Sequence, residues 1–133
     1  MATLQCEIVT PERRLYAAEA GFVVLPGAEG EMGVLPQHAP TVTTLKSGCV
    51  KVTPDGSNEP VRFVVAGGYA QVDGKQVIVL ADRATAVADI DFEAAAAQAE
   101  AANARLSALA QDDPNRAFAE SEVEWINLLL AQK

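Results

Sequence analysis

The sequence predicts a two-part fold, with an N-terminal antiparallel β-sandwich over residues 1–88 and a C-terminal antiparallel α-helical hairpin over residues 89–133. Residues 1–90 hold all nine glycines and six of the seven prolines, set between short β-branched runs. Residues 91–133 hold no glycine and a single proline, Pro114. Gly and Pro punctuate strands, whereas the alanine-rich remainder favours helix. Because no helical pattern separates the strand-like runs, two antiparallel layers are favoured over a parallel sheet.

The first part contains short apolar runs that fit about ten strands. They lie at residues 4–9, 13–25, 33–35, 41–45, 49–53, 61–66, 69–72, 76–81 and 84–88. The first two runs are compatible with two or three strands, broken at Pro11 and near Gly21. Asp-Gly pairs at 55–56 and 73–74 stand between runs, and such pairs suit hairpin turns because Gly accepts the positive φ that those turns require.

The second part predicts two helices, over residues 91–110 and from Arg116 onward. Asp91 is the expected N-cap of the first helix, and Pro114 ends it. The apolar spacing of three and four residues predicts a shared seam. Its members are Phe92, Ala95, Ala99, Ala102, Leu106 and Leu109, facing Ala119, Val123, Ile126 and Leu130, with Phe118, Trp125 and Leu129 on the adjoining stripe. Alanines bury little apolar area, so the pattern leaves open a permanently docked hairpin or an arm that unfolds outward.

Charge and chain pattern exclude several classes of partner. The formal net charge of −8 opposes binding to nucleic acid and to an anionic bilayer. No run approaches the roughly 18 apolar residues of a membrane span, and the start of the sequence has no signal-peptide pattern. We therefore expect no direct membrane insertion. Cys6 and Cys49 lack metal-ligand spacing, and we expect two reduced thiols.

Few residues are candidates for catalysis or for binding a metal or a phosphate. His38 is the only histidine, and no Cys/His cluster accompanies it, so we expect no metal and no cofactor. No serine or cysteine stands in a nucleophile-elbow sequence, and Glu29 and Glu31 would repel a phosphate from the glycine-rich stretch 27–33. Two alternatives remain from the residues alone. One is an enzyme that uses Glu31 and His38 as an acid/base pair, and the other is a free-standing adaptor that binds peptides.

Three segments carry a family resemblance. They are "PGAEGEMGVLPQHAPTVTTLKSGCV" at 26–50, "FVVAGGYAQV" at 63–72 and "VIVLADRATAVADID" at 77–91. These segments resemble the epsilon subunit of F-type ATP synthase, of the bacterial or organellar type. The resemblance implies a noncatalytic part of the central stalk that couples proton-driven rotation of the c ring to ATP synthesis. It also implies a peripheral place at the cytoplasmic face of the bacterial inner membrane.

The same resemblance assigns partners. Glu31, Gly33 and His38 would contact the c-subunit ring, an exposed face of the sandwich would bind the gamma subunit, and the hairpin would reach the alpha/beta head as a regulatory arm that blocks ATP hydrolysis.

Two departures from the family pattern change these expectations. Some members bind ATP through a motif of the form Ile/Leu-Asp-x-x-Arg-Ala. Here Ile90 and Asp91 are present but Ala94 replaces the arginine, so we expect no nucleotide site. The family's inhibitory arm uses basic residues, whereas residues 91–133 hold eight acidic and three basic side chains. We therefore expect weak or absent inhibition.

Overall fold

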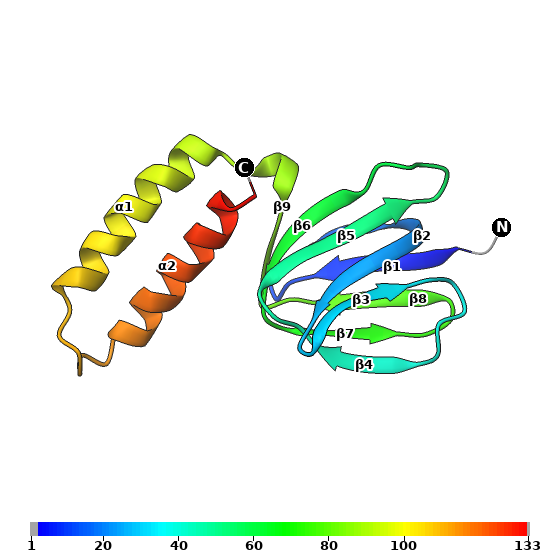
Figure 1. Cartoon of the computed structure of the whole chain (residues 1–133), viewed down its shortest axis with the longest axis horizontal. Helices are drawn as coiled ribbons and strands as arrows, with labels where there is room; N and C mark the ends of the chain where they lie inside the picture. The colour runs from blue at the N-terminus through cyan, green and yellow to red at the C-terminus, as the bar shows by residue number, and fades with distance from the viewer. Residues whose placement is uncertain (1–2, 133) are drawn as a thin grey trace. The chain divides into compact units, whose positions relative to one another are not determined.

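The computed structural model describes residues 3–132 and divides into two compact units, Met1–Ala88 and Asp89–Lys133 (Figure 1). The first unit is a mixed, mostly antiparallel sheet folded into a sandwich, and the second is a pair of antiparallel helices. The predicted two-part fold class is confirmed. Each unit is described separately below.

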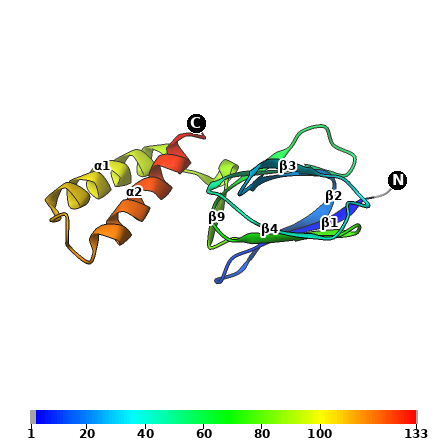
Figure 2. The same cartoon turned by 60° about the horizontal axis from the view of Figure 1, so that its bottom comes forward.

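The first unit has nine strands in two layers, and Figure 2 shows β3 in one layer and β4 in the other. The strands are β1 (Leu4–Val9), β2 (Arg14–Gly27), β3 (Gly30–Val34), β4 (Thr41–Thr44), β5 (Gly48–Pro54), β6 (Val61–Ala66), β7 (Tyr69–Val72), β8 (Gln76–Leu80) and β9 (Arg83–Ala86). Their order is β4-β7-β8-β1-β2-β5-β6-β9, with β3 paired to β2. A 3-10 turn, Val87–Asp89, follows the last strand.

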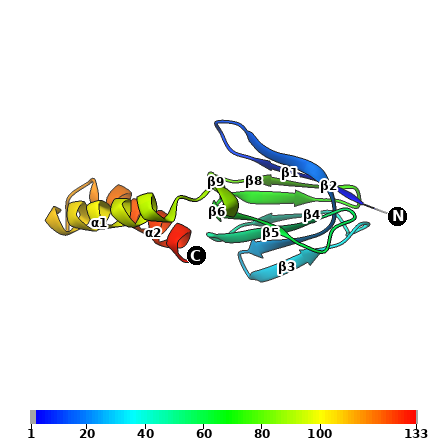
Figure 3. The ribbon, with the colours of Figure 1, turned by 90° about the horizontal axis from the view of Figure 1, so that it is seen from above.

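Strand β2 belongs to both layers. Its first half pairs with β1, and its second half pairs with β3 and β5. The break expected at Pro11 is confirmed, because the β1–β2 turn lies there and projects from the sandwich (Figure 3). The break considered near Gly21 is absent. The register shifts between Ala20 and Phe22 instead, so a β-bulge bends one continuous strand from one layer toward the other.

Strands β1 and β8 are parallel, from the Gln5–Gln76 pair to the Val9–Leu80 pair. The expectation of a wholly antiparallel sandwich is therefore wrong at this one place. Turn signals report only on consecutive strands, and β1 and β8 are joined by no hairpin. Their pairing follows from how the two layers close over a common core.

The core is made of branched and apolar side chains on the inner faces of the strands. Leu4, Ile8, Val23, Leu25, Val34, Val50, Val52, Val77 and Val79 are all fully buried. Among residues 3–132 no polar or charged side chain is buried, so no uncompensated polar group weakens the core.

The second unit consists of α1 (Phe92–Ala108) and α2 (Arg116–Leu130). The Asp91 N-cap is confirmed, because its side chain accepts a hydrogen bond of 3.0 Å from the Ala94 N–H. The predicted seam is confirmed in part. Ala95, Ala99, Ala102, Trp125 and Ile126 are buried, whereas Phe118 is 69% exposed. The second helix ends at Leu130, and Lys133 lies outside the described residues.

Candidate functional site

The three candidate contact residues occupy one edge of the sandwich. Glu31 and Gly33 lie on the edge strand β3, opposite Pro26 and Val24 of β2, and both are exposed. A Cβ on Gly33 would lie 3.0 Å from the Phe22 ring, so the missing side chain lets that ring cover the backbone. His38 lies in the loop that follows β3 and is half-buried.

The loop 35–40 is held by backbone contacts as well as by its two prolines. The His38 N–H donates to the Leu35 carbonyl at 3.2 Å, and His38 Nδ1 lies 2.7 Å from the Ala39 carbonyl. Gln37 has a φ of 71° and its N–H donates to the Gly74 carbonyl at 2.9 Å. Because Gly74 belongs to the β7–β8 turn, this bond ties the loop to the neighbouring hairpin.

The carboxylate of Asp73 orders the β7–β8 turn to which the loop is hydrogen-bonded. Asp73 Oδ1 accepts hydrogen bonds from the N–H groups of Lys75 at 2.7 Å and Gln76 at 2.9 Å. These two bonds to the charged form lower the pKa of Asp73 from its usual range. The predicted hairpin at Asp73-Gly74 is confirmed.

Glu31 and His38 do not form an acid/base pair. Within residues 3–132 no hydrogen bond or ion pair joins them. Glu31 lines a groove to which His38 does not contribute. A general acid/base pair needs both groups to converge on one bound molecule, so this geometry removes the enzyme alternative.

That groove is an acidic hollow between the β2–β3 turn and β4, with a volume of about 580 Å³. It is lined by Gly27, Ala28, Glu29, Gly30, Glu31, Met32, Thr41, Val42, Thr43 and Thr44. Gly30 closes the two-residue turn at a φ of 137°, which side chains rarely adopt. The Ala28 N–H donates to the Thr44 carbonyl at 3.0 Å and holds the turn against β4.

The charge of the groove is negative. Glu29 and Glu31 are both exposed, and its lining contains no Lys, Arg or His. The hydroxyls of Thr41 and Thr43 are already used, since they donate to the carbonyls of Ala39 and Thr44 at 3.1 Å. The groove therefore suits a polar or basic loop of another protein better than an anion.

A second surface adjoins this groove on the outer face of β4, β7, β8 and β1. The strand register places Val42, Gln71 and Ile78 in one row across β4, β7 and β8. Tyr69, Leu80 and Val9 form the next row, across β7, β8 and β1. Val42 is 68% exposed and Tyr69 is 42% exposed. We call this the outer apolar face, defined by Val9, Val42, Tyr69, Ile78 and Leu80. Exposed apolar patches of this kind mark sites of protein contact.

The sequence analysis expected an exposed binding face without naming its residues. The run 76–81 did contain a signal of such a face. Val77 and Val79 point into the core, and the alternating residues Ile78 and Leu80 are apolar as well. A strand with one solvated face normally alternates apolar and polar residues. The missing alternation leaves the apolar side chains of Ile78 and Leu80 on the outer face of β8.

The two cysteines fit their expected role as reduced thiols, and both are free. Burial raises the pKa of the Cys6 thiol to about 12, with a smaller contribution from the Glu7 carboxylate. Burial also raises the pKa of Cys49, although Arg62 and Lys51 partly oppose the rise. Neither thiol is activated as a nucleophile.

The nucleotide motif at the start of α1 serves a structural purpose. Asp91 caps the helix through the Ala94 N–H, and Ala94 offers no cation to a phosphate. Within residues 3–132 no group of three or more Cys, His, Asp or Glu side chains could hold a metal. None of the described helices is long and apolar enough to cross a membrane.

Comparison with known families gives one match that covers most of the first unit. Residues 3–87 match the model described as ATP synthase, Delta/Epsilon chain, beta-sandwich domain. Among curated proteins, the ATP synthase epsilon chain of Halorhodospira halophila is 46% identical over 100 residues, 75% of this chain and 70% of that protein. The ATP synthase epsilon chain 2 of Ralstonia nicotianae is 43% identical over 123 residues, 92% of this chain and 87% of that protein.

Solved structures extend the likeness to both units. A chain in the Euglena gracilis mitochondrial ATP synthase structure, which contains OSCP, F1 and the c-ring, matches with a TM-score of 0.78 and 26% identity, covering 98% of this chain and 81% of that chain. A chain of the Tetrahymena thermophila mitochondrial ATP synthase central stalk and c-ring shares the fold, with a TM-score of 0.62, 15% identity and 96% of each chain covered.

Proposed function

The chain belongs to the ATP synthase delta/epsilon family, and from this premise we propose that it couples rotation of the c ring to ATP synthesis as a noncatalytic part of the central stalk. Its relatives are named as ATP synthase epsilon chains, and its structural neighbours are chains of ATP synthase complexes. Catalysis then belongs to other subunits, and this chain needs a stiff body with two docking surfaces.

The observation that carries the proposal is that β4 belongs to both surfaces. One edge of β4 lines the acidic groove, and its outer face carries Val42 of the outer apolar face. A rotor component that joins two partners must hold them at a fixed angle. The two contacts share β4, which is held by its pairing with β7 at the edge of a sandwich whose core is tightly packed, and this supplies that stiffness.

We assign the groove and its adjoining loop to the c-subunit ring. Glu31 and Gly33 lie on the free edge of β3, and the loop with His38 leads directly into β4. The exposed carboxylates of Glu29 and Glu31 offer acceptors to polar loops of the ring. His38 is a packing or contact residue without a proton-transfer role.

We assign the outer apolar face to the gamma subunit. The face carries one aromatic ring, Tyr69, next to the aliphatic side chain of Leu80, with Gln71 between Val42 and Ile78. Aromatic and aliphatic groups at the centre of a patch supply most of the binding free energy in such contacts. With these two partners, we propose a peripheral position for the chain at the cytoplasmic face of the bacterial inner membrane.

Co-purification from native membranes tests both assignments. We expect the tagged chain to carry gamma and the c subunit, Tyr69→Lys to lose gamma while keeping the c subunit, and Glu31→Lys to lose the c subunit while keeping gamma. Glu59→Lys, an exposed charge reversal in the β5–β6 turn and outside both sets of surface residues, serves as the matched control and should lose neither. Purification of the unaltered chain without either subunit would contradict the proposal and favour the free-standing adaptor.

The role of the hairpin follows from its charge. The exposed carboxylates of Glu120 and Glu124 lie on α2, which has no basic residue after Arg116. An arm that approaches an acidic surface of the alpha/beta head would meet repulsion of about 1 kcal/mol per close solvated pair. We propose weak or absent inhibition of ATP hydrolysis.

A further inference from the structure

The two helices of the hairpin are poorly packed at the end where the turn joins them. A cavity of about 420 Å³ lies between the last turns of α1 and the first turns of α2. It is lined by Ala102, Arg105, Ala108, Leu109, Asn115, Phe118, Ala119 and Glu122. Phe118, the largest apolar side chain there, is 69% exposed. Apolar contact therefore does little to close this end.

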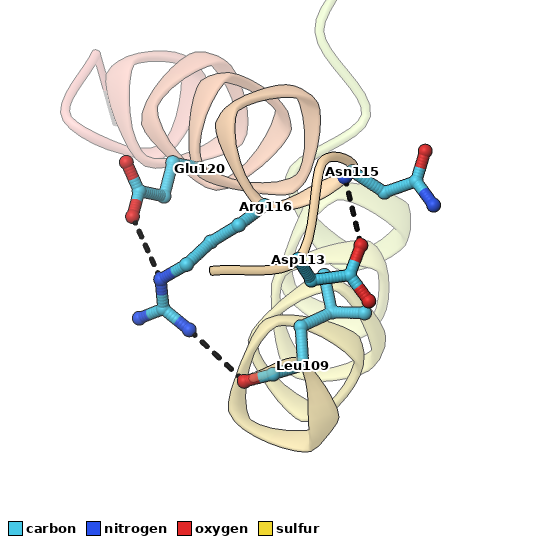
Figure 4. A network of polar contacts seen from close by, with 5 residues as sticks. All are labelled: Leu109, Asp113, Asn115, Arg116 and Glu120. Atoms are coloured by element: carbon cyan, nitrogen blue, oxygen red, sulfur yellow. Dashed lines mark hydrogen bonds and ion pairs between the residues drawn. The ribbon is translucent and has the colours of Figure 1, made fainter. Parts of the chain in front are cut away.

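A polar contact spans the turn end instead. Arg116 is the first residue of α2, and its Nη1 donates to the carbonyl of Leu109 at 3.1 Å (Figure 4). Its Nε donates to Glu120 Oε1 at 3.1 Å, one turn along α2. The Arg116 side chain is 24% exposed, so this arrangement is partly shielded from water.

The position of Leu109 gives that bond its strength. Leu109 is the C-cap of α1, and the last carbonyls of a helix lack intrahelical partners. A guanidinium at this end also meets the negative pole of the helix dipole. The Arg116 side chain of α2 therefore supplies a hydrogen-bond donor to the carbonyl at the end of α1. Glu120 fixes the orientation of the planar Arg116 guanidinium.

The other bonds of the turn are local. Asp113 Oδ1 accepts from the Asn115 N–H at 2.8 Å, as Figure 4 shows, and the Asp113 carbonyl accepts from the Arg116 N–H at 3.0 Å. The Asp113 N–H donates to the Ala110 carbonyl at 3.1 Å. These bonds shape residues 110–116 and do not reach across to α1.

We propose that Arg116 is the latch of the hairpin, holding its turn end closed and setting how readily α2 separates from α1. Loss of the latch opens the hairpin from the turn and exposes the apolar lining of the cavity, including Leu109, Phe118 and Ala119. The seam around Ala95 and Ala99, buried at the start of α1, remains closed longer.

Hydrogen–deuterium exchange on the intact chain tests this latch without the rest of the ATP synthase. We expect Arg116→Ala to speed amide exchange about tenfold in peptides from 103–109 and 117–122, because a charge-assisted bond and its ion pair are lost together. Ala is a better helix former than Arg, so a loss of protection cannot come from helix propensity. In peptides from 92–100, the logarithm of the exchange rate should rise by less than half as much.

Arg105→Ala is the matched control. Arg105 lines the same cavity, is exposed and carries the same charge, but within residues 3–132 it forms no hydrogen bond or ion pair across the turn. In Arg105→Ala we expect the amide exchange rates of the same peptides to remain within about twofold of those in the unaltered chain. Equal effects of Arg105→Ala and Arg116→Ala would reduce the proposal to a nonspecific charge effect and overturn it.

Two further variants guard against general unfolding. Glu120→Gln removes the ion pair but leaves the bond to Leu109, so it should keep most of the protection at the turn. Arg116→Lys keeps the charge but lacks the fork that serves both acceptors, so it should resemble Arg116→Ala. If Glu120→Gln opens the turn as fully as Arg116→Ala, or if all α1 peptides lose protection equally, the latch is refuted.

Discussion

The sandwich and the hairpin hold their shapes by different means. In the sandwich, large branched side chains such as Leu25, Val50 and Val79 are fully buried. In the hairpin, three of the five buried residues are alanines, and a guanidinium spans the turn where apolar packing fails. Burying a Val or Leu contributes about 1.5–3 kcal/mol, far more than burying an alanine methyl. The difference suits one unit to bear torque and the other to change shape.

The largest expected effect comes from emptying the sandwich core. Leu25→Ala should lower the free energy of unfolding of this unit by about 2–5 kcal/mol, because the packed surroundings leave a cavity. Urea titration can follow this unit through Tyr16, whose ring lies 4.8 Å from that of Phe63, and the hairpin through Trp125, the only tryptophan. Leu106→Ala, at a half-buried site of α1, is the counterpart and should cost less. Equal losses would break the contrast between the units.

A smaller effect should follow from overfilling the hairpin. Ala95 is 4% exposed, and Ala95→Leu adds three carbons where the helix backbones approach, at a cost of about 1–3 kcal/mol. The Trp125 transition should move to lower urea while the Tyr16 transition stays in place. Ala104→Leu, at an exposed site of the same helix, is the control and should leave both transitions within error. A Tyr16 shift as large as that of Trp125 would show that the units do not respond separately.

A still smaller effect concerns acid, and it belongs to the sandwich alone. Bonds from the Lys75 and Gln76 N–H groups lower the pKa of Asp73 in the folded chain. Its stabilisation is therefore present above the unfolded pKa of about 3.9 and is lost as pH falls through the lower folded value. The melting temperature of the unaltered chain should exceed that of Asp73→Asn at pH 6, and the two should converge toward pH 2.

The control for this acid effect is Asp55→Asn. Asp55 stands in the other Asp-Gly turn, where Ser57 bonds to Glu59 but the Asp55 carboxylate accepts no hydrogen bond within residues 3–132. Its melting temperature should follow that of the unaltered chain across the same pH range. If the difference in melting temperature between the unaltered chain and Asp73→Asn grew toward acid pH, it would have the wrong sign for a lowered pKa and would contradict the prediction.

The features that sequence predicted are those set by short stretches of chain. The switch from glycine-rich runs to an alanine-rich tail places the two units, because backbone freedom and helix propensity are local properties. The Asp91 cap and the Asp73 turn are equally local, since each depends on a carboxylate two or three residues from its donors. Glu31, Gly33 and His38 were named as c-ring contacts through family resemblance, since their chemistry alone suggested only an acid/base pair of Glu31 and His38.

The features that escaped prediction depend on segments far apart in the chain. The parallel pairing of β1 with β8 is set by how the layers close, which no turn residue reports. Gly21 marked an irregularity, but pattern could not distinguish a bulge from a strand end. The reach of Arg116 to Leu109 requires the path of the turn, because seven residues separate them. Likewise, Phe118 was predicted on the stripe that adjoins the seam, as Trp125 was, but it lines the cavity at the turn end and is largely exposed.

The smallest expected effect is on catalysis, and it tests whether the flexible unit regulates the enzyme. Deleting residues 91–133 should change ATP hydrolysis by the reconstituted ATP synthase less than about twofold, because an acidic arm gains little from an acidic target. The separate core of the first unit should let the shortened chain assemble. Glu124→Lys, which leaves the Arg116–Glu120 ion pair intact, supplies the matched comparison: if charge is what prevents inhibition, this arm should lower hydrolysis where the unaltered arm does not. A severalfold rise on deletion would instead show that the unaltered arm already inhibits, and the acidic face of α2 would then have to meet a basic surface.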